Sequence, residues 1–323
     1  MVLIKRWRHM KIFSLDPART LPAILASVFL SAAADAEVPL SWDSTGHIMA
    51  PVFVNGKGPF EFILDTGADE SAVYARFAQS LNLPKGTGGE ISGATGSEPM
   101  TSTPLAALAI DGHVIRHVNA DTVPDRPDGV KLAGIVGADL MVHRLMVIDL
   151  GCDTVSVHSL SSATRKLLGA GATLIHAGAI ADGQQLTLPV TVGGVSGVAM
   201  LDTGARDTII NPKFAALAGV DTDSAAFREG VPARGAAGKS VPSRSGPIGT
   251  VQFAGVTRRD VVTRVVDLPV FAGAGLADRP AMILGLDLLR GVRLSVDYSA
   301  RRFWVAPSSC HKQSPNTRTT QPS

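Results

Sequence analysis

Two stretches of this chain decide its fold. Residues 62–68 read Phe-Ile-Leu-Asp-Thr-Gly-Ala, and residues 199–205 read Ala-Met-Leu-Asp-Thr-Gly-Ala. In each stretch an aliphatic run leads into an aspartate, which predicts a buried strand that ends in a tight turn. A single Asp-Thr-Gly is a weak signal, because an Asx turn at a strand end explains it equally well. Its recurrence 137 residues later predicts a duplicated chain.

Further matches around these stretches follow the same order in both halves. The matched pairs are residues 51–56 with 189–194, 72–83 with 212–218, 93–96 with 235–238, and 135–140 with 283–288. Self-similarity in a fixed order is the signature of a repeated structural element. We therefore expect an N-terminal lobe over residues 37–160 and a C-terminal lobe over residues 173–306, joined by a linker at 161–172. Residues 307–323 are polar and lack an apolar period, which predicts a disordered tail.

The composition favours strands over long helices. The 323 residues include 33 Gly and 20 Pro, which punctuate a chain with tight turns. Hydrophobic residues make up 45% of the chain and exclude a disordered protein. The expected fold class is all-β, with two lobes that arise from an internal duplication.

Residues 1–36 are predicted to be a signal peptide. An uncharged apolar run at 21–34 is short for a membrane span, and Ala34-Asp35-Ala36 suits a signal peptidase. A buried helix is the alternative. Cleavage removes five cations and two acids, which changes the formal charge from +2 to −1 and leaves no electrostatic support for nucleic-acid binding. We expect a periplasmic or secreted protein without a stable membrane anchor.

The two cysteines allow two alternatives. Cys152 and Cys310 form one disulfide in an exported protein, or they are two independent thiols. Their separation in the sequence does not decide between these alternatives, because it does not fix the distance between the Cα atoms.

The paired motifs resemble the signature of aspartic peptidases. In that family Asp-Thr-Gly follows an aliphatic strand, and an aliphatic-aliphatic-Gly triplet follows tens of residues later, as at 135–137 and 283–285. Ala68 and Ala205 resemble the retropepsin-like branch, whereas two motifs in one chain resemble the pepsin arrangement. The resemblance implies a bilobal pair of pepsin/retropepsin-like β-barrels, with the two turns at the floor of a cleft.

The resemblance also implies an activity, namely hydrolysis of peptide bonds in a peptide or protein substrate. Asp65 and Asp202 would be the catalytic pair, which shares one proton and activates a water. The sequence does not decide which of them starts protonated. This chemistry needs no metal and no cofactor, and one chain that carries both motifs would act as a monomer. The supporting residues of the turns are Thr66, Gly67, Thr203 and Gly204.

Four residues are candidates for substrate binding: Asp69, Arg206, Gly93 and Gly235. Asp69 and Arg206 follow the two turns, where the family's equivalent acid binds the substrate backbone; an ion pair elsewhere is the alternative. The two glycines belong to Gly-rich segments at 89–100 and 233–242, which are either flaps over the cleft or plain surface hairpins.

The sequence leaves one competing function in another class. A catalytically silent bilobal module could bind a peptide in the same cleft without cutting it, but binding alone needs no second carboxylate. A two-carboxylate glycosidase would need an aromatic sugar-binding surface, which 3 Trp and 2 Tyr barely supply. His113 and His117 have no third ligand nearby in the sequence for a metal site.

Overall fold

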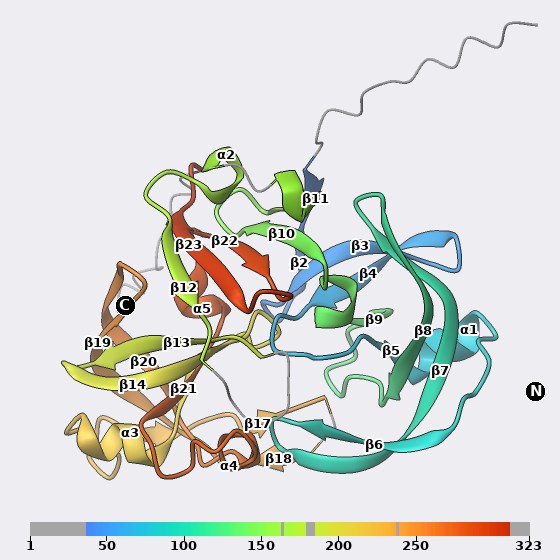
Figure 1. The fold of residues 1–323 in the computed structure, drawn as a ribbon. Coiled ribbons are helices and arrows are strands. Elements are labelled where there is room, and N and C mark those ends of the chain that lie inside the picture. Colours follow the sequence, from blue (N-terminus) through green and yellow to red (C-terminus); the bar gives the residue numbers. More distant parts are fainter. Residues whose placement is uncertain (1–36, 163–164, 179–184, 237–238, 311–323) are drawn as a thin grey trace, which may run out of the picture. The chain divides into compact units, whose positions relative to one another are not determined.

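The computed structural model describes residues 37–162, 165–178, 185–236 and 239–310 (Figure 1). The predicted signal peptide lies outside these residues. In the described part of the chain, no helix has the length and apolar character needed to cross a membrane.

The N-terminal lobe is a closed barrel. The strands follow each other around the barrel as β3 (Ile48–Val54), β4 (Lys57–Leu64), β9 (Gly134–Val136), β5 (Ala72–Tyr74), β8 (His113–Val123) and β7 (Gly96–Ile110). The pairing of β3 with β7 closes the ring. The β4–β9 and β5–β8 pairs are parallel, and the other pairs are antiparallel.

The C-terminal lobe repeats this barrel strand for strand. Its order is β13 (Thr187–Val192), β14 (Val195–Leu201), β21 (Ala281–Leu284), β15 (Ile209–Ile210), β20 (Val256–Val265) and β19 (Arg244–Phe253), and β13 pairs with β19 to close it. The parallel pairs, β14–β21 and β15–β20, fall at the same places as in the first barrel. The expected all-β, two-lobed architecture is therefore confirmed.

Shorter elements extend each barrel. In the first lobe these are β2 (Ser41–Trp42), β6 (Gly88–Gly93), the helix α1 (Ala75–Ser80) and the 3₁₀ turn η1 (Ala138–Leu140). In the second lobe they are β16 (Arg228–Glu229), β17 (Ala233–Arg234), β18 (Ser240–Val241), α3 (Pro212–Leu217), α4 (Pro269–Gly273) and α5 (Leu286–Leu289). The start of α3 follows from its sequence, because the Asn211 side chain caps it by accepting from the Phe214 N–H at 2.8 Å and Pro212 suits the first turn.

A six-stranded sheet, which the sequence analysis did not anticipate, joins the two lobes. Its order is β1 (Val38–Pro39), β11 (Thr154–Ser159), β10 (Arg144–Asp149), β22 (Val292–Asp297), β23 (Arg302–Pro307) and β12 (Thr173–His176). The first three strands come from the first half of the chain and the last three from the second. The antiparallel pairing of β10 with β22 therefore joins the halves through backbone hydrogen bonds. The predicted linker includes α2 (Arg165–Leu168), and η2 (Leu160–Ser162) overlaps its start. The Leu167 carbonyl accepts from Arg293 of β22.

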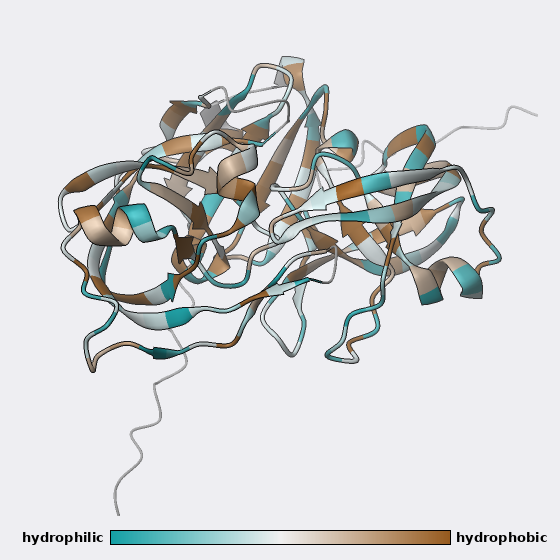
Figure 2. Cartoon of the chain, turned by 90° about the horizontal axis from the view of Figure 1, so that it is seen from below, coloured by the Kyte–Doolittle hydropathy of each residue, from teal (hydrophilic) through white to brown (hydrophobic). Residues whose placement is uncertain are grey.

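The core lies inside the barrels and under the joining sheet. Long strands such as β7 alternate buried and exposed positions, whereas β9 and β21 are buried along their whole length. Figure 2 shows the apolar and polar positions that produce this pattern. Because β9 and β21 lie inside the structure, they hold the adjacent turns firmly in place.

The C-terminal end of the described chain corrects one expectation. Residues 307–310, assigned to a disordered tail, are ordered: β23 runs to Pro307, and the Ser308 N–H donates to the Gly291 carbonyl at 2.9 Å. Cys310 forms a disulfide with Cys152, with 5.0 Å between the Cα atoms. Of the two alternatives for these cysteines, a disulfide or two independent thiols, the structure has the disulfide. Residues 311–323, the rest of the predicted tail, lie outside the described residues.

Removing this disulfide should destabilise the protein. The two cysteines are 158 residues apart in the sequence, so the bridge restricts a large part of the unfolded chain. We expect Cys152→Ser combined with Cys310→Ser to lower the free energy of unfolding by about 2–5 kcal/mol. Urea unfolding measures the change, and the reduced wild-type protein serves as the control. Equal midpoints for the oxidised wild type and the double variant would contradict the expectation.

Candidate active site

Each Asp-Thr-Gly turn begins where a barrel strand ends beside a buried parallel neighbour. The Asp65 N–H donates to the Val136 carbonyl at 3.0 Å, and the Asp202 N–H donates to Leu284 at 3.1 Å. The next residues of those neighbouring strands are glycines that cross tightly behind the turns. A Cβ on Gly137 would lie 2.6 Å from the Glu70 backbone, so a larger residue does not fit there.

Two threonines tie the turns to each other. The Thr66 hydroxyl donates to the Leu201 carbonyl at 3.1 Å, and the Thr203 hydroxyl donates to the Leu64 carbonyl at 2.6 Å. Each hydroxyl also accepts from the backbone N–H of the other threonine at 3.0 Å. Both residues are buried. The turns are therefore held together across the lobes by buried hydrogen bonds.

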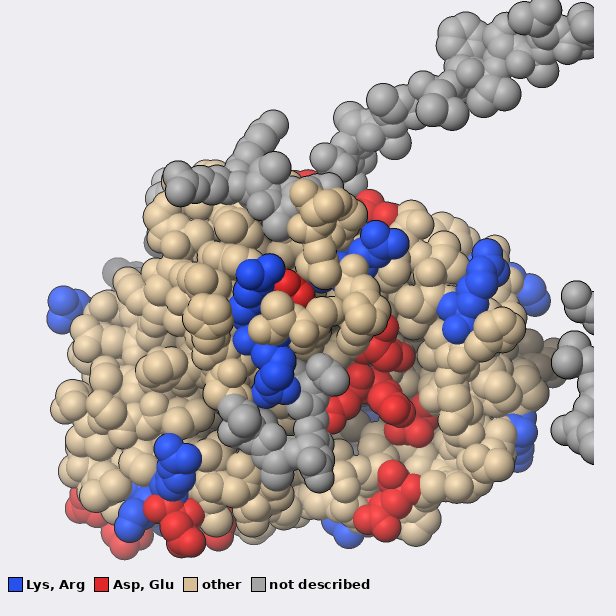
Figure 3. Space-filling view, viewed as in Figure 1, with Lys and Arg blue, Asp and Glu red and all other residues tan. Residues whose placement is uncertain are grey.

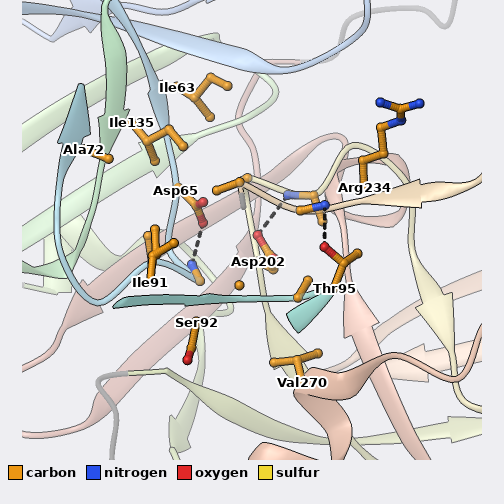
Figure 4. Close-up of a pocket in the computed structure, with 18 of the residues that line it drawn as sticks. Ile63, Asp65, Ala72, Ile91, Ser92, Thr95, Ile135, Asp202, Arg234 and Val270 are labelled. Atoms are coloured by element: carbon orange, nitrogen blue, oxygen red, sulfur yellow. Dashed lines mark hydrogen bonds between the residues drawn. The ribbon is translucent and has the colours of Figure 1, made fainter. Parts of the chain in front are cut away.

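The locked turns place the two aspartates side by side (Figure 4). A Cβ on Gly204 would lie 2.2 Å from Cγ of Asp65, and a Cβ on Gly67 would lie 2.8 Å from Cγ of Asp202. Each glycine thus leaves the space that the opposite carboxyl occupies. The Gly67 N–H donates to Oδ1 of Asp65 at 2.8 Å, and the Ala205 N–H donates to Oδ1 of Asp202 at 2.8 Å.

The surroundings of the pair favour proton uptake. Burial raises the pKa of Asp65, the negative charge of Asp202 raises it further, and the Gly67 N–H opposes both effects. Burial also raises the pKa of Asp202 against the donors of its own turn. The two carboxyls are close neighbours, each beside the glycine of the opposite turn. Because two adjacent carboxylates cannot both ionise cheaply, this arrangement favours a single proton on the pair.

A second pair of carboxyls braces the turns from behind. The Ser71 hydroxyl donates to Asp139 at 2.6 Å and accepts from the Gly137 N–H at 3.1 Å. The second lobe repeats this arrangement with Thr208, Asp287 and Gly285, at 2.6 and 3.1 Å. The sequence analysis assigned no role to Ser71, Asp139, Thr208 or Asp287. The signal was present, because the matched stretches 135–140 and 283–288 both contain Gly followed two residues later by Asp.

A cavity of about 630 Å³ opens over the pair and is lined by both lobes. Gly93 on the β6–β7 hairpin and Gly235 beside β17 are among its lining residues, so both Gly-rich hairpins border the cleft. The hairpins also meet: the Gly235 N–H donates to the Thr95 hydroxyl at 3.2 Å, and Lys239 forms an ion pair with Glu98 at 2.8 Å. We call this contact the hairpin latch.

The structure separates the two charged candidates for substrate binding. Asp69 lines the cavity, whereas Arg206 is not among the lining residues. The Arg206 guanidinium forms an ion pair with Asp207 at 2.7 Å and donates to the Thr45 carbonyl of the other lobe at 3.3 Å. Arg206 therefore has the ion pair that the sequence analysis gave as the alternative, and it adds a contact between the lobes.

Acidic side chains gather on the part of the cavity that belongs to the N-terminal lobe, and Figure 3 shows acidic groups around the hollow of this face. Burial and the neighbouring carboxylates, foremost Asp121, raise the pKa of Glu70. Among the residues that the structure describes, no three His, Cys, Asp or Glu side chains gather as metal ligands. The acidic lining residues beyond the pair are Asp69, Glu70, Glu90, Asp121, Asp125 and Asp128.

Comparison with known proteins agrees with this geometry. A family model described as aspartyl protease matches residues 50–140 and again residues 188–288. Each matched region contains one Asp-Thr-Gly turn and the strand that crosses behind it. No curated protein is a significant match to the chain. The two regions together span more than half of the sequence, and the chain therefore belongs to the aspartyl protease family, with one family region in each lobe.

Proposed function

We propose that this protein is an aspartic endopeptidase whose Asp65/Asp202 pair activates water to hydrolyse peptide bonds. One observation carries the proposal: two adjacent carboxyls, one from each lobe, lie at the floor of a cavity of about 630 Å³. The ionised carboxyl takes a proton from the water as it attacks the peptide carbonyl. The protonated carboxyl polarises that carbonyl and later donates its proton to the leaving nitrogen.

The surrounding contacts support this chemistry. The exchanged threonine hydrogen bonds fix the two carboxyls relative to each other, which general acid–base catalysis requires. Both aspartates are only partly covered by protein, so a water and a substrate can reach them. The hairpins that border the cavity can exclude bulk water once a peptide is bound.

A silent peptide-binding module of the same fold is the alternative function. Two half-buried carboxyls beside each other are costly, because loss of solvation and mutual repulsion both oppose ionisation. Peptide binding alone does not require the second carboxyl, so it does not explain this unfavourable arrangement. The intact pair, with its donors and braces in both lobes, therefore favours the enzyme.

The same proposal covers location and assembly. A disulfide forms readily in an oxidising compartment, which supports export to the periplasm or the outside medium. Both aspartates belong to one chain, which supports activity as a monomer. The partner is a peptide or protein substrate. The acidic side chains that line the cavity would repel the phosphates of a nucleic acid.

Replacing either aspartate should abolish turnover. We expect Asp65→Asn or Asp202→Asn to lower kcat by about 10³-fold or more, and the double variant to be no worse, because the two residues act as one group. Digestion of a peptide library measures the loss, and Asp223→Asn on an exposed turn is the matched control. Intact peptide binding without cleavage by the wild type at any pH would instead support the binding module.

The pH profile of kcat/KM should be bell-shaped. Activity falls at low pH when both carboxyls are protonated and at high pH when both are ionised. Burial raises the pKa of both groups above 3.8, so the basic limb should lie above the range of an ordinary carboxyl. Ala68→Ser with Ala205→Thr adds hydroxyl donors that favour the ionised form, and the basic limb should move toward acid. A limb that stays in place or moves to higher pH would contradict this.

The hairpin latch should affect substrate binding. Lys239→Ala removes the ion pair with Glu98 and a bond to the Ser97 carbonyl at 2.9 Å. An exposed pair of this kind is worth about 0.2–1 kcal/mol, so we expect KM to rise by about 1.5–5-fold with little change in kcat. High salt should remove the difference between the variant and the wild type. Lys213→Ala, at an exposed position of α3, is the control and should leave KM unchanged.

A further inference from the structure

A tyrosine hydroxyl lies directly behind one of the two turns. Tyr298 follows β22 and has only 1% of its surface exposed. Its hydroxyl donates to the Thr66 carbonyl at 2.9 Å. Three carboxyls, those of Asp65, Asp202 and Asp69, lie near enough for their negative charge to act on it. Burial and these carboxyls raise the pKa of Tyr298, so the hydroxyl keeps its proton and remains a donor.

The accepting carbonyl belongs to the same peptide group that serves Asp65. That peptide joins Thr66 to Gly67, and its N–H donates to Oδ1 of Asp65 at 2.8 Å. A hydrogen bond to the oxygen of a peptide polarises the group and makes its N–H a better donor. The Tyr298 hydroxyl thus acts on the Asp65 carboxylate through a single peptide group.

The other lobe does not repeat this arrangement. Tyr298 directly follows Asp297, and the matching position after Asp149 is Leu150. Leucine has no hydroxyl, so the peptide between Thr203 and Gly204 receives no such bond from that position. Oδ1 of Asp202 accepts instead from the N–H of Ala205, one residue later in its turn, at 2.8 Å. The two aspartates therefore differ in their surroundings, although the turns have the same sequence.

We propose that Tyr298 is a positioning residue that makes the two carboxyls unequal, because it fixes the Asp65 turn and strengthens the hydrogen bond that stabilises negative charge on Asp65. The inference rests on the proposed peptidase function, in which one carboxyl acts as base and the other as acid. A symmetric pair would have no built-in preference between the two roles, and Tyr298 supplies one.

Tyr298→Phe keeps the buried ring and removes only the hydroxyl. Loss of the relayed donor disfavours ionisation, so both limbs of the kcat/KM profile should move to higher pH. The hydrogen bond from Tyr298 should strengthen the charge-assisted bond between the Gly67 N–H and Asp65 by about 10–30% of its energy. Its loss should therefore move each limb by about 0.1–0.6 pH unit. We expect kcat to fall several-fold, while KM changes little.

Ser295→Ala is the matched control. Ser295 lies on β22, the strand that Tyr298 follows. It is fully buried and donates to the Leu167 carbonyl at 3.4 Å, away from the turns. It should lower stability without moving the pH profile. If Tyr298→Phe also lowers stability and leaves both limbs in place, Tyr298 is merely structural and the proposal is overturned.

A second probe does not depend on the folding of Tyr298→Phe. The chain has 2 Tyr, so Tyr298 is the only tyrosine in a Tyr74→Phe protein. Incorporating 3-fluorotyrosine there makes the hydroxyl a stronger donor, and both limbs should move toward acid relative to the unlabelled Tyr74→Phe protein. No movement, or movement in the opposite direction, contradicts the relay.

Carboxyl titration separates the inference from the proposed function. The ¹³C signals of Asp65 and Asp202 report proton uptake without turnover. If the wild type cleaves no peptide but Tyr298→Phe still moves the titration to higher pH, the peptidase assignment fails and the relay stands. If the wild type cleaves peptides and the titration does not move, the relay fails and the peptidase assignment stands.

Discussion

The exchange of hydrogen bonds between Thr66 and Thr203 is the interaction on which the rest of the site depends. Four buried hydrogen bonds cross between the turns, and removing either hydroxyl leaves polar partners without a bond in a dry environment. The exchange sets the distance between the turns, and that distance requires glycine at 67 and 204. The joining sheet holds the two lobes in register so that the exchange can form.

The exchange also creates an energetic cost, because it places two half-buried carboxyls side by side. Two features offset the cost: N–H donors in each turn and a single proton on the pair. The braces built from Ser71 with Asp139 and from Thr208 with Asp287 hold the glycines behind the turns. Stability and reactivity thus come from different layers of the same site.

Departures from the repeat show where the two lobes have different tasks. Arg206 occupies the position that corresponds to Asp69, and it contacts the opposite lobe while Asp69 faces the cavity. Tyr298 replaces the leucine of the first lobe and donates to one turn only. The acidic lining belongs to the first lobe, whereas Arg234 reaches the cavity from the second. A duplicated chain has in this way become an asymmetric site.

The sequence by itself determined the duplication, the strand-and-turn character of both motifs and the identity of the paired aspartates. Each of these can be recognised from short contiguous motifs that occur twice in the chain. The tertiary structure alone decided the disulfide, the joining sheet, the ion pair of Arg206 and the contact of Tyr298 with Thr66. Apart from the ion pair of Arg206 with the adjacent Asp207, these features join residues far apart in the sequence. Local propensity specifies strands and turns, but only the packing of two closed barrels brings such distant groups within bonding distance.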